Sequence, residues 1–442
     1  MEEIHAQYAA SLRSYIRGQV HVILKEPAHY LKHPFVDPGS IYDGNLWDWD
    51  SFWAVYALLN LAETQEEHEL YLRHAKGNIH NFMDHQLEDG YIPMMIAKGD
   101  SPEPYLIEKH KQGEILNMHK PFLCQQIALI GGVCGDFEWM RGYADALEAY
   151  FACYDRHYYH ASTGLYVWAD DVMIGMDNDP ATFGRPRFST ANTFLNAFMV
   201  SELLAMEVIA GKLGDKNRAA YYHAKAEALG EAIRTECWDP RDRFFYSVDV
   251  DIRTRPYDWF HKGLGVFWKS APIKIRAWSG FIPLWSGAAD ADQAAFLARV
   301  HAVDRNTFSD PFGIRSLARD EKMYDISATN NPSNWLGPIW IVVNYVVFRG
   351  LMNYGYREEA GTIHRQTLEL LGSDLEKTGT LHEYYDPDTG RPVMNGGFLN
   401  WNLLVLNMVD EWSGKEPLSR HITEDSGVIQ RNIPVSPKGV SL

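Results

Sequence analysis

The sequence predicts an all-α fold built from helical hairpins that close into a ring. Apolar residues recur at spacings of three and four positions, the pattern of amphipathic helices, in eight segments of the chain. These segments are residues 52–63, 120–133, 137–155, 190–213, 215–236, 290–302, 338–353 and 355–372. No long strands alternate with them, which disfavours a parallel sheet.

Two pairs of these segments indicate helical hairpins. Residues 190–213 precede 215–236, and residues 338–353 precede 355–372, each pair across a short turn that contains Gly or Asn. Helices joined in this way lie antiparallel as neighbours. Hairpins repeated along a long chain either stack as a solenoid or close into a ring, and we find no fixed sequence period of the kind a solenoid shows. A ring is therefore preferred.

Short aromatic stretches lie between the helical segments. GYIPMMIA at 90–97, GLYVWADDV at 164–172 and DRFFYSVDV at 242–250 are bounded by Gly, Pro and Asp. This pattern suits small β-hairpins or extended loops, which we expect at the rim of the ring.

The chain length leaves the number of domains open at first. A chain of 442 residues corresponds to about three domains at ~150 residues each. No Ser/Gly-rich linker or charge run divides it, however. We therefore expect one domain over residues 1–415, followed by a polar tail, residues 416–442, that wraps the surface or is loosely ordered.

The charge of the chain argues against two classes of partner. There are 58 acidic and 41 basic residues, giving a formal net charge of −17, and a field of that sign repels nucleic acid and anionic membranes. No run of eighteen apolar residues occurs, and the first residues lack the basic and apolar regions of a signal peptide. We expect a soluble, cytoplasmic protein without nucleic-acid or membrane partners.

The spacing of the cysteines bears on whether the protein contains a structural metal site or disulfides. The four cysteines, Cys124, Cys134, Cys153 and Cys237, are widely spaced without a CxxC or a His cluster at zinc spacing. This argues against a structural metal and against disulfides, and favours reduced, partly buried thiols.

Aromatic residues make up 13% of the chain. They suit either an aromatic core or rings on which carbohydrate ligands stack.

The stretch WDWDSFW, residues 47–53, combines acids with tryptophans. Asp48, Asp50 or Ser51 would serve as a helix N-cap for the apolar segment that follows. Capping does not account for two acids interleaved with three tryptophans, because an acid between large aromatic rings is partly desolvated and needs a partner such as ligand hydroxyls. For Asp50 we therefore prefer a ligand contact, with capping as the alternative.

Two further acids lie in separate loops. In GMDNDP, residues 175–180, an Asx-turn would explain Asp177, and in HEYYDPDTG, residues 382–390, turn chemistry explains Asp386–Gly390 but not Glu383. A helical ring would bring two such carboxylates face to face. One protonated and one ionised carboxyl group are the minimum equipment for glycoside hydrolysis. Spacing alone does not place them together.

A fourth motif, NPSNWLGPIW at residues 331–340, has Asn, Pro and Trp at the start of a helix. In this order the four motifs resemble bacterial members of glycoside hydrolase family 63 and the related trehalases, and the branch that hydrolyses mannosylglycerate and glucosylglycerate is the most similar in size. The resemblance covers residues 40–412 and rests on four ordered motifs rather than on one. It implies an (α/α)6 toroid and hydrolysis of an α-glycosidic bond with inversion.

The resemblance also implies roles for individual residues. Asp177 would be the general acid and Glu383 the general base. Trp49 and Asp50 would hold the nonreducing sugar. Trp335 would line the same pocket, and Trp340 would lie behind it. Asn196 and Trp401 would support the site. The full set of expected substrate-binding residues is Trp49, Asp50, Trp47, Tyr42, His119, Lys120, Gly175, Arg187, Trp335, Gly337, Trp340, Tyr384 and Trp401.

The chain departs from the trehalase pattern at residues 117–122. NMHKPF stands where the trehalases have Arg-Ser-Gln-Pro-Pro, which disfavours trehalose as substrate. His119 and Lys120 would place positive charge near the cleft and suit a carboxylated aglycone such as glycerate, the alternatives being a capping His and a solvated Lys. Arg185 or Arg187 would close over the site on a mobile loop.

We therefore expect an exo-acting enzyme that removes a terminal α-linked glucose or mannose from a small glycoside, such as glucosylglycerate, mannosylglycerate or an α-glucobiose. It would need no metal and no organic cofactor, its partner would be a small carbohydrate, and it could form a homo-oligomer. Two alternatives come from other classes. One is a sugar epimerase or isomerase with a His pair as acid and base; the other is a noncatalytic carbohydrate-binding protein.

Overall fold

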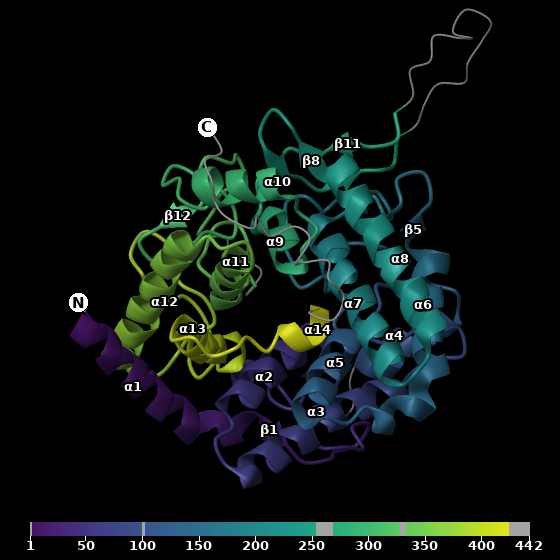
Figure 1. Ribbon diagram of the computed structural model, residues 1–442, viewed down its shortest axis with the longest axis horizontal. Helices are drawn as coiled ribbons and strands as arrows, with labels where there is room; N and C mark the ends of the chain where they lie inside the picture. Colours follow the sequence, from purple (N-terminus) through teal and green to yellow (C-terminus); the bar gives the residue numbers. More distant parts are fainter. Residues whose placement is uncertain (1, 100–101, 253–267, 328–332, 424–442) are drawn as a thin grey trace, which may run out of the picture.

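Six inner helices form a closed ring around the centre of the molecule (Figure 1). The computed structural model describes residues 2–99, 102–252, 268–327 and 333–423. Within them, each inner helix packs against the next one in the chain and the last returns to the first. They are α2 (Asp48–Leu61), α5 (Leu123–Cys134), α7 (Thr193–Lys212), α9 (Ile282–Ser286), α11 (Ile341–Asn353) and α13 (Leu404–Trp412).

A second set of helices surrounds the inner ring. It consists of α1 (Glu2–Gln19), α3 (Gln65–Asp84), α6 (Ala144–His157), α8 (Lys216–Ala232), α10 (Ala291–Phe296) and α12 (Arg357–Thr378). In the described residues, outer and inner helices alternate along the chain. This is an (α/α)6 toroid, as predicted. The short helices α4 (Pro102–Lys111) and α14 (Arg420–Thr423) are additions to it.

The position of a helix in the two rings explains its sequence pattern. Every residue of α2 is buried, because an inner helix has neighbours on all sides and so needs no polar face. Outer helices keep a polar face, and two of them begin with a capping box: Thr64 and Glu67 form one at α3, and Asp290 and Gln293 form one at α10.

Helix α7 is long and apolar enough to cross a membrane by length and composition alone. It lies in the inner ring with most of its residues buried, between α5, α8 and α9. Its apolar composition is that of a core helix. Asn192 caps its first turn by accepting a hydrogen bond from the backbone N–H of Phe194.

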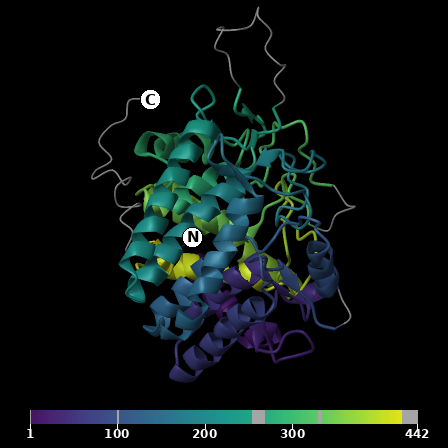
Figure 2. The same cartoon turned by 90° about the vertical axis from the view of Figure 1, so that its right-hand side faces the viewer.

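Short antiparallel strand pairs lie outside the helices, and many of them gather with the loops on one side of the ring (Figure 2). The pairs are β1 (Leu24–Lys25) with β2 (Phe35–Val36), β3 (Leu46–Trp47) with β4 (Met95–Ile96), β5 (Tyr159–His160) with β6 (Leu165–Tyr166), β8 (Trp238–Asp239) with β9 (Phe244–Phe245), and β12 (Ser309–Asp310) with β13 (Gly313–Ile314). A three-stranded sheet joins β7 (Thr190–Ala191), β10 (Val248–Asp249) and β11 (Ala271–Pro272).

The predicted local elements differ from the structure in a few places. The stretch 164–172 supplies β6, one strand of a hairpin. The stretch 242–250 supplies β9, one strand of another hairpin, and β10 of the three-stranded sheet. The stretch 90–97 instead supplies β4, which pairs with the distant β3. Both predicted helical hairpins are present, as α7 with α8 and α11 with α12.

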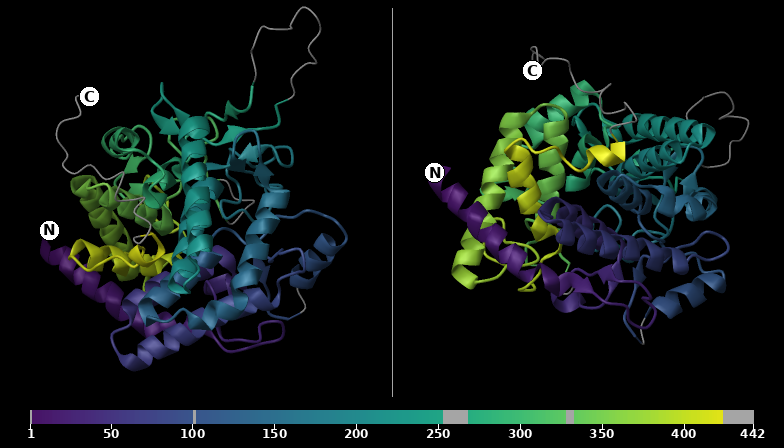
Figure 3. Two further views of the ribbon diagram at one scale, coloured as in Figure 1. Left: turned by 45° about the vertical axis from the view of Figure 1, so that its right-hand side comes forward. Right: turned by 60° about the horizontal axis from the view of Figure 1, so that its bottom comes forward.

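The expected tail begins in a segment that packs on the toroid. Helix α14 contacts α5 and α7, and Ser419 donates a backbone hydrogen bond to the hydroxyl of Tyr56. Figure 3 shows α14 beside the inner helices, away from α1 at the other end of the chain. Residues 424–442, the rest of the predicted tail, lie outside the described residues.

Candidate active site

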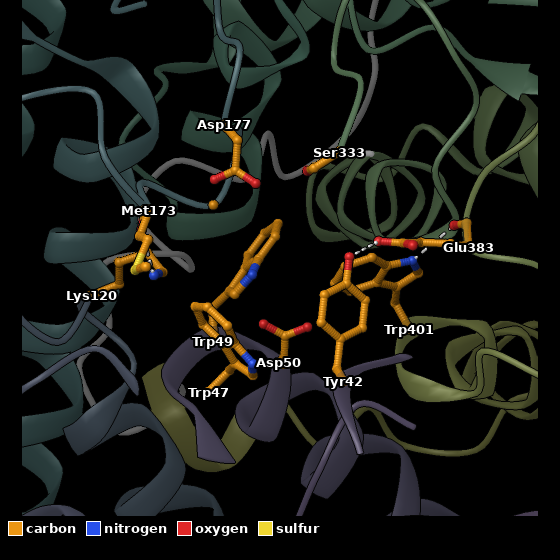
Figure 4. A pocket seen from close by; sticks show the side chains of 11 residues that line it. Tyr42, Trp47, Trp49, Asp50, Lys120, Met173, Asp177, Ser333, Glu383 and Trp401 are labelled. Atoms are coloured by element: carbon orange, nitrogen blue, oxygen red, sulfur yellow. Dashed lines mark hydrogen bonds between the residues drawn. The ribbon is translucent and has the colours of Figure 1, made fainter. Parts of the chain in front are cut away.

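One pocket collects the acids and tryptophans of the sequence motifs (Figure 4). About 440 Å³ of space, which includes the open mouth, lies between its walls. The pocket is lined by Tyr42, Trp47, Trp49, Asp50, Lys120, Met173, Gly175, Asp177, Ser333, Glu383 and Trp401. These residues come from widely separated parts of the chain, brought together by closure of the ring.

The tryptophan wall is rigid because further aromatic rings support it. Trp49 lies at centroid distances of 5.5 Å from Trp401 and 5.8 Å from Trp335. Trp335 in turn stacks on Trp340 at 4.1 Å with an interplanar angle of 5°, and Trp340 stacks on Tyr384 at 4.6 Å. Such contacts stabilise rings beyond the burial of their area. The wall is therefore held in place before a ligand arrives.

Asp177 reaches the pocket from a loop whose neighbours hold its shape. Gly175 has a φ of +92°, and a Cβ there would lie 3.4 Å from the ring of Trp49, so this position favours glycine. Asn178 accepts a 2.6 Å hydrogen bond from the backbone N–H of Trp335 and donates to Asn334. Asp179 accepts hydrogen bonds from Thr182 and Asn192. The turn residues after Asp177 thus fix its backbone, leaving its side chain directed into the pocket.

Glu383 is held on the opposite side of the pocket by donors to both of its oxygens. The hydroxyl of Tyr42 donates a 3.0 Å hydrogen bond to Oε1, and Nδ2 of Asn395 donates to Oε2. The backbone of Glu383 is fixed as well, since its N–H binds the carbonyl of Met394 and its carbonyl accepts the indole N–H of Trp401. Figure 4 shows Asp177 and Glu383 facing the pocket from different sides, with Trp49 and Asp50 between them.

Asp50 is a third buried carboxylate of the pocket. It lies in the first turn of α2, and Nδ2 of Asn400 donates a 2.6 Å hydrogen bond to its Oδ1. Burial raises the pKa of Asp50 well above its usual range, while the charge of Lys120 acts in the opposite direction. A carboxyl group in such a place suits hydrogen bonding to sugar hydroxyls.

Lys120 lines the pocket but is already paired. Its ammonium group lies 2.7 Å from Oδ1 of Asp48 and donates a 3.0 Å hydrogen bond to the carbonyl of Met173. Asp48 also accepts the backbone N–H groups of Trp49 and Lys120, each at 2.7 Å. Both side chains are almost fully buried. The pair therefore ties the start of α2 to the segment before α5.

Burial raises the pKa of both candidate catalytic acids. For Asp177 a hydrogen bond from Ser333 and the charge of Lys120 act against this rise. For Glu383 burial raises the pKa to about 7, with the hydrogen bonds from Asn395 and Tyr42 acting against it and the charge of Asp177 adding to it. Burial therefore favours the protonated form of each carboxyl group.

Nine of the predicted site residues line this pocket together: Tyr42, Trp47, Trp49, Asp50, Lys120, Gly175, Asp177, Glu383 and Trp401. Three others, Trp335, Trp340 and Tyr384, form the stack behind Trp49 instead of the surface. Gly337 has a φ of +133°, and a Cβ there would lie 2.3 Å from the ring of Tyr324. Gly337 therefore allows the loop to pack closely against Tyr324.

His119 and Arg187 do not line the pocket. His119 is buried against Phe82 at a centroid distance of 4.4 Å, its Nδ1 contacts the carbonyl of Lys120, and burial lowers its pKa to about 4. It therefore brings no positive charge to the cleft at neutral pH. Arg187 donates hydrogen bonds to the carbonyl oxygens of Ile115 and Ala169. Arg185 donates hydrogen bonds to the side chains of Thr190 and Asp249. These arginines fasten the segment after Asp177 to its surroundings.

Sequence reasoning missed several residues of the site. Met173 and Ser333 line the pocket, and Asn395 and Asn400 hold Glu383 and Asp50. Ser333 had a weak signal, since it stands within NPSNWLGPIW. The two asparagines belong to Gly-rich or aromatic stretches near Glu383 and Trp401, and nothing in their spacing points to the acids they contact. Asn196, expected to support the site, holds the backbone of Tyr166 in β6.

The chain is similar to known glycoside hydrolases. The family model described as "Mannosylglycerate hydrolase MGH1-like glycoside hydrolase domain" matches residues 43–402. Mannosylglycerate hydrolase MGH1 of Selaginella moellendorffii is 33% identical over 164 residues, 37% of this chain and 30% of the relative. A probable mannosyl-oligosaccharide glucosidase of Schizosaccharomyces pombe is 25% identical over 290 residues, 63% of this chain and 32% of the relative. The aligned regions thus span about a third of the length of these curated relatives.

Solved structures show the same fold. The mannosylglycerate hydrolase of glycoside hydrolase family 63 from Thermus thermophilus, in complex with glucose, superposes with a TM-score of 0.64 at 20% identity, covering 88% of this chain and 98% of the other. Neutral trehalase Nth1 from Saccharomyces cerevisiae superposes with a TM-score of 0.53 at 14% identity, covering 91% and 78%.

Proposed function

Because the chain belongs to the mannosylglycerate hydrolase MGH1-like family of glycoside hydrolases, we propose that it is an inverting, exo-acting α-glycosidase. Its substrate would be a small glycoside with a terminal α-linked glucose or mannose. The observation that carries this proposal is the presence of Asp177 and Glu383 in one buried pocket whose walls include Trp47, Trp49 and Trp401. One sugar ring would stack on these tryptophans, and Asp50 would accept hydrogen bonds from its hydroxyls.

Asp177 acts as the general acid in this mechanism. Burial raises the pKa of Asp177, and in this role its proton would pass to the glycosidic oxygen as the bond to the anomeric carbon breaks. Glu383 acts as the general base and takes a proton from the attacking water on the other face of the ring. The hydrogen bonds from Tyr42 and Asn395 to Glu383 support this assignment, because they stabilise its ionised form.

An inverting reaction needs space for a water molecule between the sugar and the base. The two carboxyl groups of such enzymes stand about 6.5–9.5 Å apart, against about 5 Å in retaining enzymes. Asp177 and Glu383 lie on different sides of the pocket (Figure 4). Attack from the face opposite the leaving group would release the β-anomer from an α-glycoside.

The charge of the pocket bears on the leaving group. Lys120 is the cation of the described pocket lining, and Asp48 already balances its charge. A glycerate carboxylate would have to share this ammonium with Asp48, whereas a neutral sugar would need no cation. We therefore place neutral α-glucobioses beside glucosylglycerate and mannosylglycerate as candidate substrates. The lining of the described pocket contains no His, which makes an epimerase with a histidine pair the weaker candidate.

The experiment is a hydrolysis panel of glucosylglycerate, mannosylglycerate, trehalose, kojibiose, nigerose and maltose. Release of glucose or mannose is measured for the wild-type protein and for Asp177→Asn and Glu383→Gln. We expect hydrolysis of at least one substrate and loss of turnover in both variants with binding of the sugar retained. Conversion of a sugar without hydrolysis, or full activity of Asp177→Asn, would overturn the proposal.

A further inference from the structure

Three metal-ligating side chains converge on the outer side of the toroid, away from the candidate active site. They are Asp89, in the loop between α3 and β4, and Cys153 and His157, both on α6. One ligand atom from each residue lies within 4.8 Å of the other two. Sequence spacing did not reveal this group, because Asp89 is far from the other two residues along the chain and Cys153 is not part of a CxxC motif.

The two residues on α6 have the spacing of a helical metal site. Cys153 and His157 are four positions apart, so their side chains lie on the same face of the helix. Histidines with this i, i+4 spacing bind zinc on one face of a helix in known metalloproteases. Cys153 is fully buried, whereas His157 is partly exposed. The cluster thus has a buried sulfur ligand and a route from solvent.

The lone pairs of this cluster are largely unused. Within the described part of the chain, neither the thiol of Cys153 nor the imidazole of His157 takes part in a hydrogen bond, although His157 makes edge contacts with the rings of His110 and Tyr158. A buried polar group without a hydrogen-bond partner is costly, and a cation bound by the thiol, the imidazole and the carboxylate together would serve as that partner. In an ordinary surface ion pair the two side chains already satisfy each other.

The carboxylate of Asp89 is oriented by residues around it. Nε2 of His110 lies 2.7 Å from Oδ2, and the backbone N–H of Tyr91 donates a 3.1 Å hydrogen bond to Oδ1. The ring of His110 is itself held by stacking on Tyr91 at a centroid distance of 3.9 Å. Arg156 donates to the backbone carbonyl of Asp89 and fixes the loop. Outer contacts of this kind commonly orient metal ligands.

We propose that Asp89, Cys153 and His157 bind a zinc ion, with one water molecule as the fourth ligand and His110 as the partner that orients Asp89. A sulfur, nitrogen and oxygen set suits Zn²⁺ and excludes the all-oxygen preference of Mg²⁺ and Ca²⁺. Small side-chain rotations would bring the three ligand atoms to zinc distances of about 2.0–2.3 Å. The ion would fasten the 85–94 loop to α6, and α4 with it through His110.

The test is metal binding by the full chain after removal of metals with a chelator. Zn²⁺ is titrated in competition with a chromophoric chelator, and Co²⁺ is then used as a spectroscopic probe, because a thiolate ligand gives Co²⁺ a charge-transfer absorption. We expect one equivalent of Zn²⁺, a Co²⁺–thiolate absorption band and a rise of the Tm with zinc concentration. His157→Ala should weaken binding at least tenfold, and Cys153→Ser should abolish the Co²⁺–thiolate band.

Two matched variants control for nonspecific metal binding. Cys134→Ser removes a partly exposed thiol and His21→Ala removes an exposed imidazole, both outside the cluster; each should bind as the wild type does. His157 is partly exposed, so His157→Ala serves even where Cys153→Ser fails to fold. Absence of a stoichiometric site, an unchanged affinity in His157→Ala, or loss of the band in Cys134→Ser would overturn the proposal. None of these readouts depends on glycosidase activity.

Discussion

The hydroxyl of Tyr42 donates a 3.0 Å hydrogen bond to Oε1 of Glu383, although 341 positions of sequence separate the two residues. With the donor from Asn395 on the other oxygen, it stabilises the ionised carboxylate in a place where burial raises the pKa of Glu383 to about 7. The protonation state of the proposed base is therefore set by a balance between desolvation and two hydrogen bonds.

Tyr42→Phe should shift the acid limb of the pH profile upward. The base must be ionised, so kcat/KM rises with pH through the pKa of Glu383. Loss of a hydrogen bond to a charged group costs about 1.5–3 kcal/mol, and one pKa unit is about 1.36 kcal/mol. We expect a shift of about one to two pH units toward higher pH in kcat/KM. Tyr384→Phe is the control, since Tyr384 packs behind Trp340; equal profiles for wild type and Tyr42→Phe would contradict the assignment.

The two acids should respond differently to the leaving group. For a natural α-glycoside, Asp177→Asn should lower kcat/KM about 10²–10⁴-fold because general acid catalysis is lost. With an α-glycosyl fluoride, whose leaving group needs no protonation by a strong acid, the loss should be much smaller. Glu383→Gln should lose activity on both substrates alike. Comparable losses of Asp177→Asn on the two substrates would remove this residue from the acid role.

Asn178 connects the loop of Asp177 to the tryptophan stack. Asn178→Ala leaves the backbone N–H of Trp335 without its 2.6 Å acceptor, at a cost of about 1–3 kcal/mol in the free energy of unfolding. We expect kcat/KM to fall by at least about tenfold, because small displacements of a catalytic group have large effects. Steady-state kinetics and urea unfolding measure the two effects. The exposed Asn217→Ala should change neither, and unchanged kinetics in Asn178→Ala would argue against the connection.

The ion pair of Lys120 and Asp48 should stabilise the fold mainly by compensating each charge. Lys120→Met leaves Asp48 buried without its partner, and such a change typically costs about 3–5 kcal/mol. The double variant Lys120→Met/Asp48→Asn removes both charges and should regain part of this loss. Urea unfolding of the single and double variants gives the coupling free energy. Additive effects would show that the two side chains do not depend on each other.

Glu202 should make stability depend on pH. It is buried in α7 and accepts the backbone N–H groups of Cys124 at 2.8 Å and Gln125 at 3.0 Å, and burial raises its pKa to about 7 from 4.5. The folded state therefore holds a proton that the unfolded state has released between these values. Its contribution is full below about pH 4.5 and is lost as the pH rises to about 7, amounting to about 3 kcal/mol.

Urea unfolding at pH 5 and pH 8 measures this dependence. Glu202→Gln carries no titrating group at this position, so its free energy of unfolding should fall less between the two pH values than that of the wild type. Parallel changes in the two proteins would show that Glu202 does not hold its proton in the folded state.

Much of the fold was predictable because outer helices and paired helices carry local signals. The segments that became α8 and α12 show polar faces and short turns, which periodicity detects. The eight predicted segments did not include α1, α3, α9 and α13. Helix α9 is only five residues long and begins with Ile282 and Pro283, and α13 is nine residues long and follows a 3₁₀ turn. Both are shorter than the window of about 11–18 residues in which helical periodicity is read.

The same difference between local and spatial information applies to the pocket. Glu383 was selected because turn chemistry left its carboxylate unexplained, and Asp177 because it offers a second carboxylate in a separate loop. Trp335 and Trp340 are as conspicuous in sequence as Trp49, yet they lie behind it. The sequence does not show which tryptophan side chains face the cavity and which pack behind them. Ser333 contacts Asp177 only through the closure of the toroid, whereas Asn395 reaches Glu383 through the local backbone pairing of Glu383 with Met394. Cytoplasmic location and homo-oligomer formation stay predictions from the sequence.

The stereochemistry of the first product tests the central claim most directly. Hydrolysis of the best α-glycoside of the panel is followed by proton NMR from the first turnovers, before mutarotation equilibrates the anomers. Asp177 and Glu383 acting on opposite faces of the sugar, with a water molecule at Glu383, predict that the β-anomer appears first. Initial release of the α-anomer would contradict this account.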